Sequence, residues 1–200
     1  MADLFMESFL KSTDVIDWKD PAVLAHSRDL ARGLADPVAV AKRCFEWVRD
    51  EVKHSHDFGL RPVTCSASEV LREGSGYCYA KSHLLAALLR ANGLPTGLCY
   101  QRLSRDDNGA PYSLHGLNAV LLPGVGWYRV DPRGNRTGID AQFGPPIEQL
   151  AFPIRLPGEA DLPEIWPDPL SIVVDALRAH VSADVLWENL PDLPLWTTPA

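Results

Sequence analysis

The spacing of apolar and polar positions predicts helices in the first half of the chain. Residues 20–34 and 36–53 each begin with an Asp-Pro pair, in which the aspartate can cap a helix and the proline suits its first turn. Apolar residues then recur at helical spacing. A third, short helix is predicted from Ser66, which forms a capping box with Glu69, and it ends at Gly74.

A longer apolar run between residues 76 and 93 predicts a central helix. Ser75 or Gly76 is the expected cap, and Gly93 is the expected end. We interpret Lys81 and Arg90 as a solvated face of this helix. The apolar face is formed by four leucines, Leu84, Leu85, Leu88 and Leu89.

Alternating patterns predict strands after the central helix. Residues 96–103 form the first, and residues 114–121 and 126–131 form a pair joined by a tight turn at Pro123 and Gly124. Helices come first and antiparallel strands follow. This order predicts an α+β fold in which the N-terminal helices and the central helix pack on an antiparallel sheet.

Proline becomes frequent after residue 140, which predicts an extended segment that wraps the domain. Residues 169–180 offer one more helix, and the tail 189–200 is expected to be irregular and open to motion. We therefore predict a single domain over residues 1–200. Its core covers about residues 15–140, and residues 141–200 are the C-terminal extension.

Composition narrows the range of functions. The chain has 200 residues, of which 46% are hydrophobic, so a core can form without disulfides. The net charge of −7 disfavours nucleic acid and anionic membranes as partners and is compatible with a neutral or cationic substrate. No apolar run approaches the 18 or so residues of a membrane-spanning helix. The oligomeric state stays open.

The cysteines and the N-terminus predict a cytoplasmic protein. The four cysteines contain no Cys-x-x-Cys pair, which favours free thiols in a reducing compartment. Asp3 and Glu7 stand where an export signal would carry positive charge.

Cys78 is the first candidate for chemistry. It lies at the start of the central helix, where unpaired backbone N–H groups stabilise an anion such as a thiolate or an oxyanion. The alternative is that Cys78 only fills the core.

His115 and Asp131 are the candidate partners of Cys78. If the strand pair turns around residue 123, both residues lie eight positions from its centre. With an odd loop they are directly opposite, on one face, with Cβ atoms about 5 Å apart. The carboxylate would then orient the imidazole and stabilise its charged form. Alternatively, His115 is an ordinary sheet histidine and Asp131 only opens a turn.

Several motifs together resemble the transglutaminase-like superfamily of cysteine enzymes. They are "GYCYAKSHLLAALLRANGLPTG", "LHGLNAVLL" and "GWYRVDPRGN", and upstream "FEWVRDEVKHSHD" and "SASEVLREGSG" resemble the lead-in helices of bacterial members. The resemblance covers roughly residues 15–135. It implies a papain-like core in which Cys78 is the nucleophile, His115 the base and acid, and Asp131 the orienting residue.

The resemblance implies acyl chemistry on a peptide or protein amide or ester, through a thioester that water or an amine resolves. Hydrolysis, as by a peptidase, amidase or deamidase, is slightly favoured over transglutaminase-type crosslinking. Many members carry an aromatic residue two positions after the histidine, whereas this chain has Leu117. This difference alters the wall near the base and leaves the acyl acceptor open. Tyr77 and His56 are candidates for the oxyanion site and the cleft.

The sequence leaves alternatives to this function, among them a metal site and a binding module. His54, His56, Cys65, Cys78 and His83 fit no standard set of zinc ligands, so we expect no metal and no cofactor. A non-catalytic peptide- or protein-binding module, with its cleft occluded by the C-terminal extension, is the main alternative. Acetyl transfer from a thioester cofactor is a further one, and no motif in the sequence supplies a pocket for that cofactor.

Overall fold

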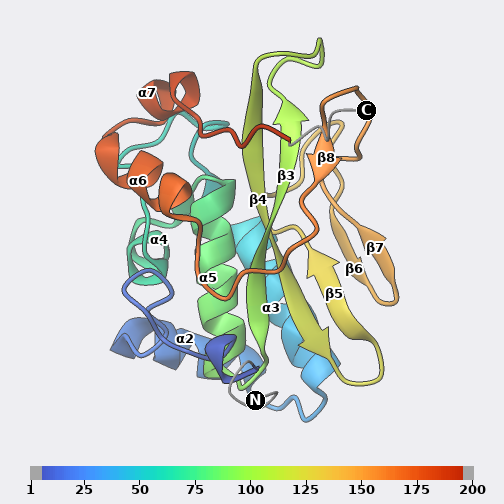
Figure 1. Cartoon of the computed structure of the whole chain (residues 1–200). Helices are drawn as coiled ribbons and strands as arrows, with labels where there is room; N and C mark the ends of the chain where they lie inside the picture. The colour runs from blue at the N-terminus through green and yellow to red at the C-terminus, as the bar shows by residue number, and fades with distance from the viewer. Residues whose placement is uncertain (1–5, 196–200) are drawn as a thin grey trace.

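The computed structural model describes residues 6–195 and has a helical layer packed on a sheet (Figure 1). The elements of the helical layer are α2 (Pro21–Ala31), α3 (Pro37–Glu51), α4 (Ala67–Glu73) and the central α5 (Cys78–Ala91). The main sheet has the order β5-β4-β3-β8. Its strands are β3 (Thr96–Ser104), β4 (Tyr112–Leu122), β5 (Gly126–Val130) and β8 (Ala160–Asp161). This is the predicted α+β fold.

Two smaller sheets, which the sequence pattern did not predict, complete the strand pairing. In one, β1 (Lys53–His54) pairs in parallel with β2 (Ser75–Gly76). In the other, β6 (Gln142–Gly144) and β7 (Ile147–Gln149) form a hairpin. The first pair lies immediately before α5 and therefore sets where that helix begins.

The predicted helix starts are confirmed by their hydrogen bonds. Asp20 accepts from the backbone N–H groups of Ala22 and Val23 in the first turn of α2, and Asp36 accepts from that of Val38 in α3. Ser66 and Glu69 form the expected capping box at α4. Gly74 ends that helix in the left-handed region at φ 63°, which glycine adopts without strain.

The start of α5 differs from the prediction. Ser75 and Gly76 do not cap it, because they are paired with Lys53 and His54 in the β1–β2 ladder. Tyr77 is the N-cap and makes no side-chain capping bond. The first turn of α5 therefore keeps backbone N–H groups without a side-chain cap, directly at the nucleophile candidate.

The interpretation of Lys81 and Arg90 as a solvated face is wrong. Lys81 is fully buried and Arg90 is 2% exposed, because α5 is covered on all sides by the other helices and the sheet. The Lys81 ammonium donates to the carbonyls of Arg49 and Val52 at the end of α3, where helix carbonyls lack partners. Within residues 6–195, no helix is long and apolar enough to cross a membrane.

The register of the hairpin corrects the predicted alignment of His115 with Asp131. The β4–β5 pairs run from Leu122 with Gly126 to Asn118 with Val130, so the turn is centred on residue 124 rather than 123. Continued by one residue, this register puts Asp131 opposite Leu117. The three-residue loop is odd, as expected, so His115 and Asp131 keep the same face and are diagonal neighbours, within reach of long side chains.

The segment after residue 140 packs along the core. β8 pairs with β3, and the backbones of Leu98 and Trp166 form a further bridge. α6 (Ser171–Ala179) falls within the helix predicted at 169–180, whereas α7 (Ala183–Glu188) was not predicted. The irregular tail returns to the sheet, where the N–H of Leu114 donates to the carbonyl of Pro191 (2.8 Å). Residues 196–200 of the predicted tail lie outside the described part of the chain.

Candidate active site

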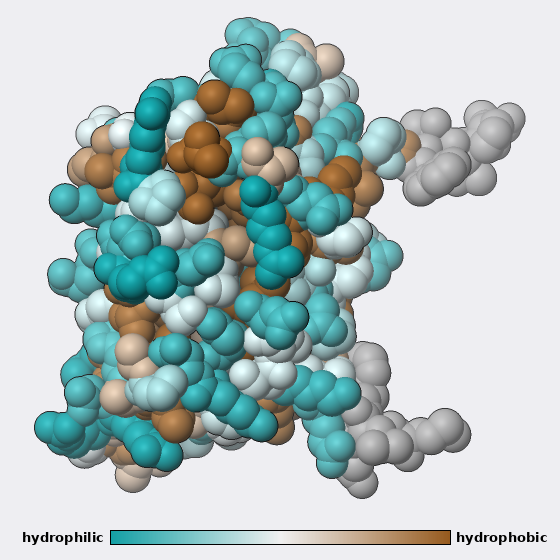
Figure 2. Space-filling view, turned by 90° about the vertical axis from the view of Figure 1, so that its left-hand side faces the viewer, coloured by the Kyte–Doolittle hydropathy of each residue, from teal (hydrophilic) through white to brown (hydrophobic). Residues whose placement is uncertain are grey.

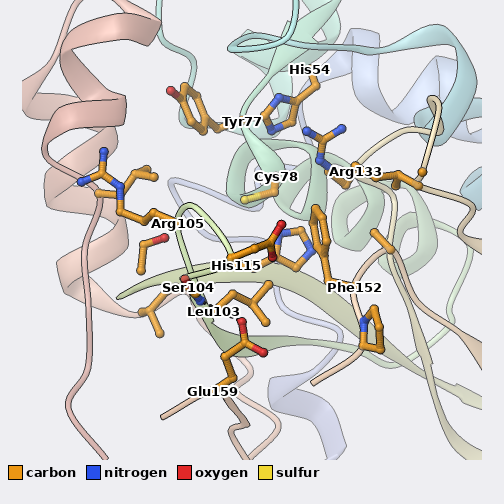
Figure 3. A pocket seen from close by; sticks show the side chains of 18 of the residues that line it. His54, Tyr77, Cys78, Leu103, Ser104, Arg105, His115, Arg133, Phe152 and Glu159 are labelled. Carbon is orange, nitrogen blue, oxygen red and sulfur yellow. Dashed lines mark hydrogen bonds between the residues drawn. The ribbon is translucent and has the colours of Figure 1, made fainter. Parts of the chain in front are cut away.

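Cys78 is the first residue of α5 and lines a cleft of about 370 Å³ (Figure 3). Its residue surface is 6% exposed. The β1–β2 ladder fixes the preceding residues, and the hydroxyl of Tyr79 donates to the carbonyl of Leu114, which ties the first turn of α5 to β4. The thiol therefore sits at a helix N-terminus, facing a cavity.

His115 and Asp131 form a short hydrogen bond beside this thiol. The distance between His115 Nε2 and Asp131 Oδ2 is 2.7 Å, and both side chains are buried. The same carboxylate accepts from the backbone N–H groups of Arg133 and Ala151, each at 3.1 Å. Because Nε2 is held by Asp131, the ring nitrogen left for Cys78 is Nδ1.

The electrostatics of this group favour a charged imidazole. Burial alone would lower the pKa of His115, but the Asp131 carboxylate and the Cys78 side chain outweigh it and raise the pKa to about 10. Burial likewise opposes ionisation of Asp131, yet His115 and the two backbone donors hold the pKa of that carboxyl below its usual value. The arrangement suits a thiolate–imidazolium pair oriented by a carboxylate. The structure thus brings together Cys78, His115 and Asp131, the three residues singled out in the sequence.

The aromatic wall next to the base comes from a segment that carried no sequence signal. Leu117 packs in a buried cluster with Cys99 and Ala119. The aromatic contact to His115 is made instead by Phe152, edge to face, with ring centroids 4.9 Å apart. Ala151, next to it, supplies one of the donors to Asp131. Neither role was predicted, because both residues lie in an irregular stretch far along the chain.

The two oxyanion candidates have different positions. Tyr77 lines the cleft, but its hydroxyl donates to the carbonyl of Ala183 (2.6 Å), and burial raises its pKa. His56 is not among the lining residues, and its ring stacks on Trp187 with centroids 4.2 Å apart. A tyrosine whose proton is already engaged and a histidine outside the cleft are both poorly placed to receive an oxyanion.

His54, rather than the predicted His56, lines the cleft. Figure 3 shows it above Cys78 and beside Tyr77. The centroids of the His54 and Tyr77 rings are 5.3 Å apart. Burial, followed by the positive charges of Arg133 and Lys81, lowers the pKa of His54 well below its usual value, so its imidazole is neutral at neutral pH. A neutral imidazole can donate one hydrogen bond. The histidine pair in "HSHD" was a signal for this residue, but the choice between the two needed the structure.

The described residues hold no group of three or more histidine, cysteine, aspartate or glutamate side chains placed to bind a metal ion. Cys65 and Cys78, the two cysteines considered as zinc ligands, are free thiols.

The comparison with protein families gives a match over residues 25–132, more than half of the chain, to the transglutaminase-like superfamily. The chain belongs to this family, as its motifs predicted. The matched region holds Cys78, His115 and Asp131 and ends before Phe152 and the C-terminal helices. Membership supports a cysteine-dependent enzymatic role in general, and not a particular reaction.

Solved structures resemble this chain at low sequence identity. One is a candidate cysteine protease of Cytophaga hutchinsonii, with a TM-score of 0.51 and 17% identity over 62% of this chain and 40% of that chain. Another is the periplasmic domain of TgpA from Pseudomonas aeruginosa, with a TM-score of 0.45 and 22% identity over 62% of this chain and 45% of that one. The chain thus spans less than half the length of either structure. A comparison with curated proteins found no match.

Proposed function

We propose that the protein is a cysteine hydrolase or acyltransferase that attacks an amide or ester carbonyl of a peptide or protein. The observation that carries the proposal is the buried contact between His115 and Asp131 (2.7 Å) beside Cys78, with Cys78 and His115 lining one cleft. In this mechanism the Cys78 thiolate adds to the carbonyl carbon. The His115 imidazolium then gives its proton to the departing amine or alcohol, which leaves a thioester on Cys78.

Hydrolysis of the thioester uses the same residues, but His115 now acts as a base instead of an acid. Neutral His115 takes a proton from water, and the resulting hydroxide equivalent releases the acid and restores the thiol. An amine in place of water would give transamidation. We favour hydrolysis, and an amine acceptor remains a proposal to test. Asp131 holds the imidazole with Nε2 toward itself throughout.

We assign His54 and the backbone N–H of Cys78 as donors to the oxyanion of the tetrahedral intermediate. His54 is neutral, buried and in the cleft, and the N–H belongs to the first turn of α5. Fixed donors of this kind stabilise charge that develops in the transition state.

The decisive experiment is the rate at which iodoacetamide labels Cys78 at pH 6. We expect labelling well above that of a model thiol, because only an activated cysteine is a thiolate at this pH. A rate equal to that of the model thiol would rule out the nucleophile. Replacing His115 with alanine should slow labelling. A panel of amide, ester and glutamine-peptide substrates, each with and without an amine, then separates hydrolysis from transamidation.

A non-catalytic binding module is the second candidate. The small exposure of Cys78 and the exposed apolar residues Val181 and Val185 favour it. Figure 2 shows hydrophobic residues gathered on the upper part of the face where α6 and α7 lie in Figure 1. A panel that gives no turnover, together with peptide binding that is unchanged by Cys78→Ser, would support this function. The cytoplasmic location, drawn from the thiols, stays a prediction in either case.

A further inference from the structure

Arginines outnumber carboxylates among the residues that line the cleft, four to two. Arg133, Arg136 and Arg155 all line it, and we call these three residues the arginine wall. This is unexpected in a chain with 19 basic and 26 acidic side chains. The function proposed above does not use these charges.

The ion pairs of the wall involve a single carboxylate among the described residues. Asp57 holds Arg133 in a two-point contact at 2.7 and 2.9 Å. The same carboxylate is 3.6 Å from Arg136, whose side chain is 57% exposed. Arg155 is exposed, and no described carboxylate lies within 4.0 Å of its guanidinium. One carboxylate thus pairs with both Arg133 and Arg136, and Arg155 has no ion pair with a described residue.

Two acids, Asp107 and Glu159, also line the cleft, and neither forms an ion pair with the arginine wall among the described residues. The oxygens of Glu159 accept from three backbone N–H groups, those of Ser104, Arg155 and Leu156, at 2.8 to 3.0 Å. Its carboxylate holds the loop in place, and its charge still acts on Arg155 without a direct ion pair. Arg105, elsewhere in the cleft, is committed as well, since it donates to the carbonyl of Trp187 and lies over its ring.

We propose that the arginine wall binds a carboxylate of the substrate, so that the preferred substrate is an acidic peptide. This proposal rests on the proposed function and names its substrate class. Guanidinium groups match carboxylates in geometry, and a cleft with an excess of one sign of charge concentrates ligands of the opposite sign. The local charge therefore outweighs the net charge of −7, which by itself pointed to a neutral or cationic substrate. The carboxylate belongs either to an acidic side chain or to the C-terminus of a peptide.

The test compares two alkylating reagents of nearly equal size on the full chain. The rate constants for Cys78 with iodoacetate and iodoacetamide are measured by intact mass and peptide mapping, and their ratio is divided by that of a model thiol. We expect the wild-type ratio to exceed the model ratio by about tenfold at low salt and to shrink in high salt. The His115 imidazolium also attracts iodoacetate, so variants must separate the two contributions.

The double variant Arg136→Gln with Arg155→Gln keeps the triad and removes the two least compensated charges. Its ratio should fall at least threefold below that of the wild type. The matched control is Arg72→Gln, an exposed arginine on α4 paired with Glu73, which should leave the ratio unchanged. An unchanged ratio in the double variant overturns the proposal. If iodoacetamide itself reacts no faster than with the model thiol, the nucleophile fails, and the ratio still reports the charge of the cleft.

Two further reagent pairs identify the source of the carboxylate. Chloroacetyl-glutamate α-amide against chloroacetyl-glutamine amide tests an acidic side chain. Chloroacetyl-glycine against its amide tests a terminal carboxylate. A preference for the acid in either pair that is lost in the double variant supports the proposal and names the source. No preference in both pairs overturns it.

Discussion

The substitution Asp131→Asn tests most directly why the imidazole is charged. In the native chain the pKa of His115 is raised from 6.5 to about 10. At about 1.4 kcal/mol per pKa unit, this amounts to roughly 4–5 kcal/mol in favour of the charged ring. Asp131 makes the largest favourable contribution, against the opposing effect of burial. Without the carboxylate charge, burial should prevail and the pKa of His115 should fall steeply.

The expected result is loss of the thiolate–imidazolium pair at acidic and neutral pH. Iodoacetamide labelling of Cys78 at pH 6 should fall by about a hundredfold, toward the small thiolate fraction of an ordinary thiol. Turnover of any substrate found in the panel should fall by about 10³–10⁴-fold. Labelling measured from pH 6 to pH 10 should show the largest difference between the wild type and the variant at pH 6.

Asp131→Asn also affects the stability of the fold, and this must be separated from its effect on labelling. Asparagine has one acceptor oxygen, whereas Asp131 accepts from the N–H groups of both Arg133 and Ala151. One backbone donor loses its partner, at a cost of about 1–3 kcal/mol. Asp17→Asn is the control, because Asp17 also accepts a backbone N–H, that of Ser68, away from the cleft. A folded Asp131→Asn protein that labels at the wild-type rate at pH 6 would refute the reasoning.

Three other predictions concern residues around the triad. The variant His54→Gln should slow turnover about 10²-fold while iodoacetamide labelling of Cys78 stays near normal, and His56→Gln should leave both unchanged; equal effects of the two variants would remove His54 from the oxyanion site. Burial lowers the pKa of Lys81 from 10.5 to about 7, so the folded chain releases this proton more readily than the unfolded one. Relative to Lys81→Met, the wild-type free energy of unfolding in urea should therefore rise between pH 7 and 10, and a flat difference would contradict the burial. In Gly116→Ala the new Cβ would lie 2.9 to 3.3 Å from Tyr79, including its backbone, whereas Gly144→Ala meets nothing within 4 Å. We expect the first to lower the free energy of unfolding by about 1–3 kcal/mol and the second to be near neutral in thermal melts, and a reversed order would refute this.

Much of the fold could be predicted because its signals are local. Asp20, Asp36 and Ser66 mark helix starts through hydrogen bonds to residues two or three positions away, and such bonds are visible in the sequence. The short strands β6, β7 and β8 and the helix α7 were missed, since their pairing and packing depend on distant segments rather than on their own pattern.

The error in the hairpin register has a simple physical cause. The sequence identified a tight turn at Pro123 and Gly124 but not which residue lies at its centre. Gly124 has φ 73°, and the loop takes in Val125 as its third residue. A shift of the centre by one residue moves a partner by two positions and keeps the face. The association of His115 with Asp131 therefore survived the error, whereas direct opposition did not.

The family motifs and the three residues of the candidate triad could be identified without the structure, because helix starts and strand alternation depend on near neighbours. The environment of those residues comes from the tertiary fold. It buried Lys81, placed His54 rather than His56 in the cleft, and brought Phe152 against His115. It also gathered the arginine wall from two separate stretches of chain. Burial and local charge depend on which distant segments meet, and no local pattern in the chain records those meetings.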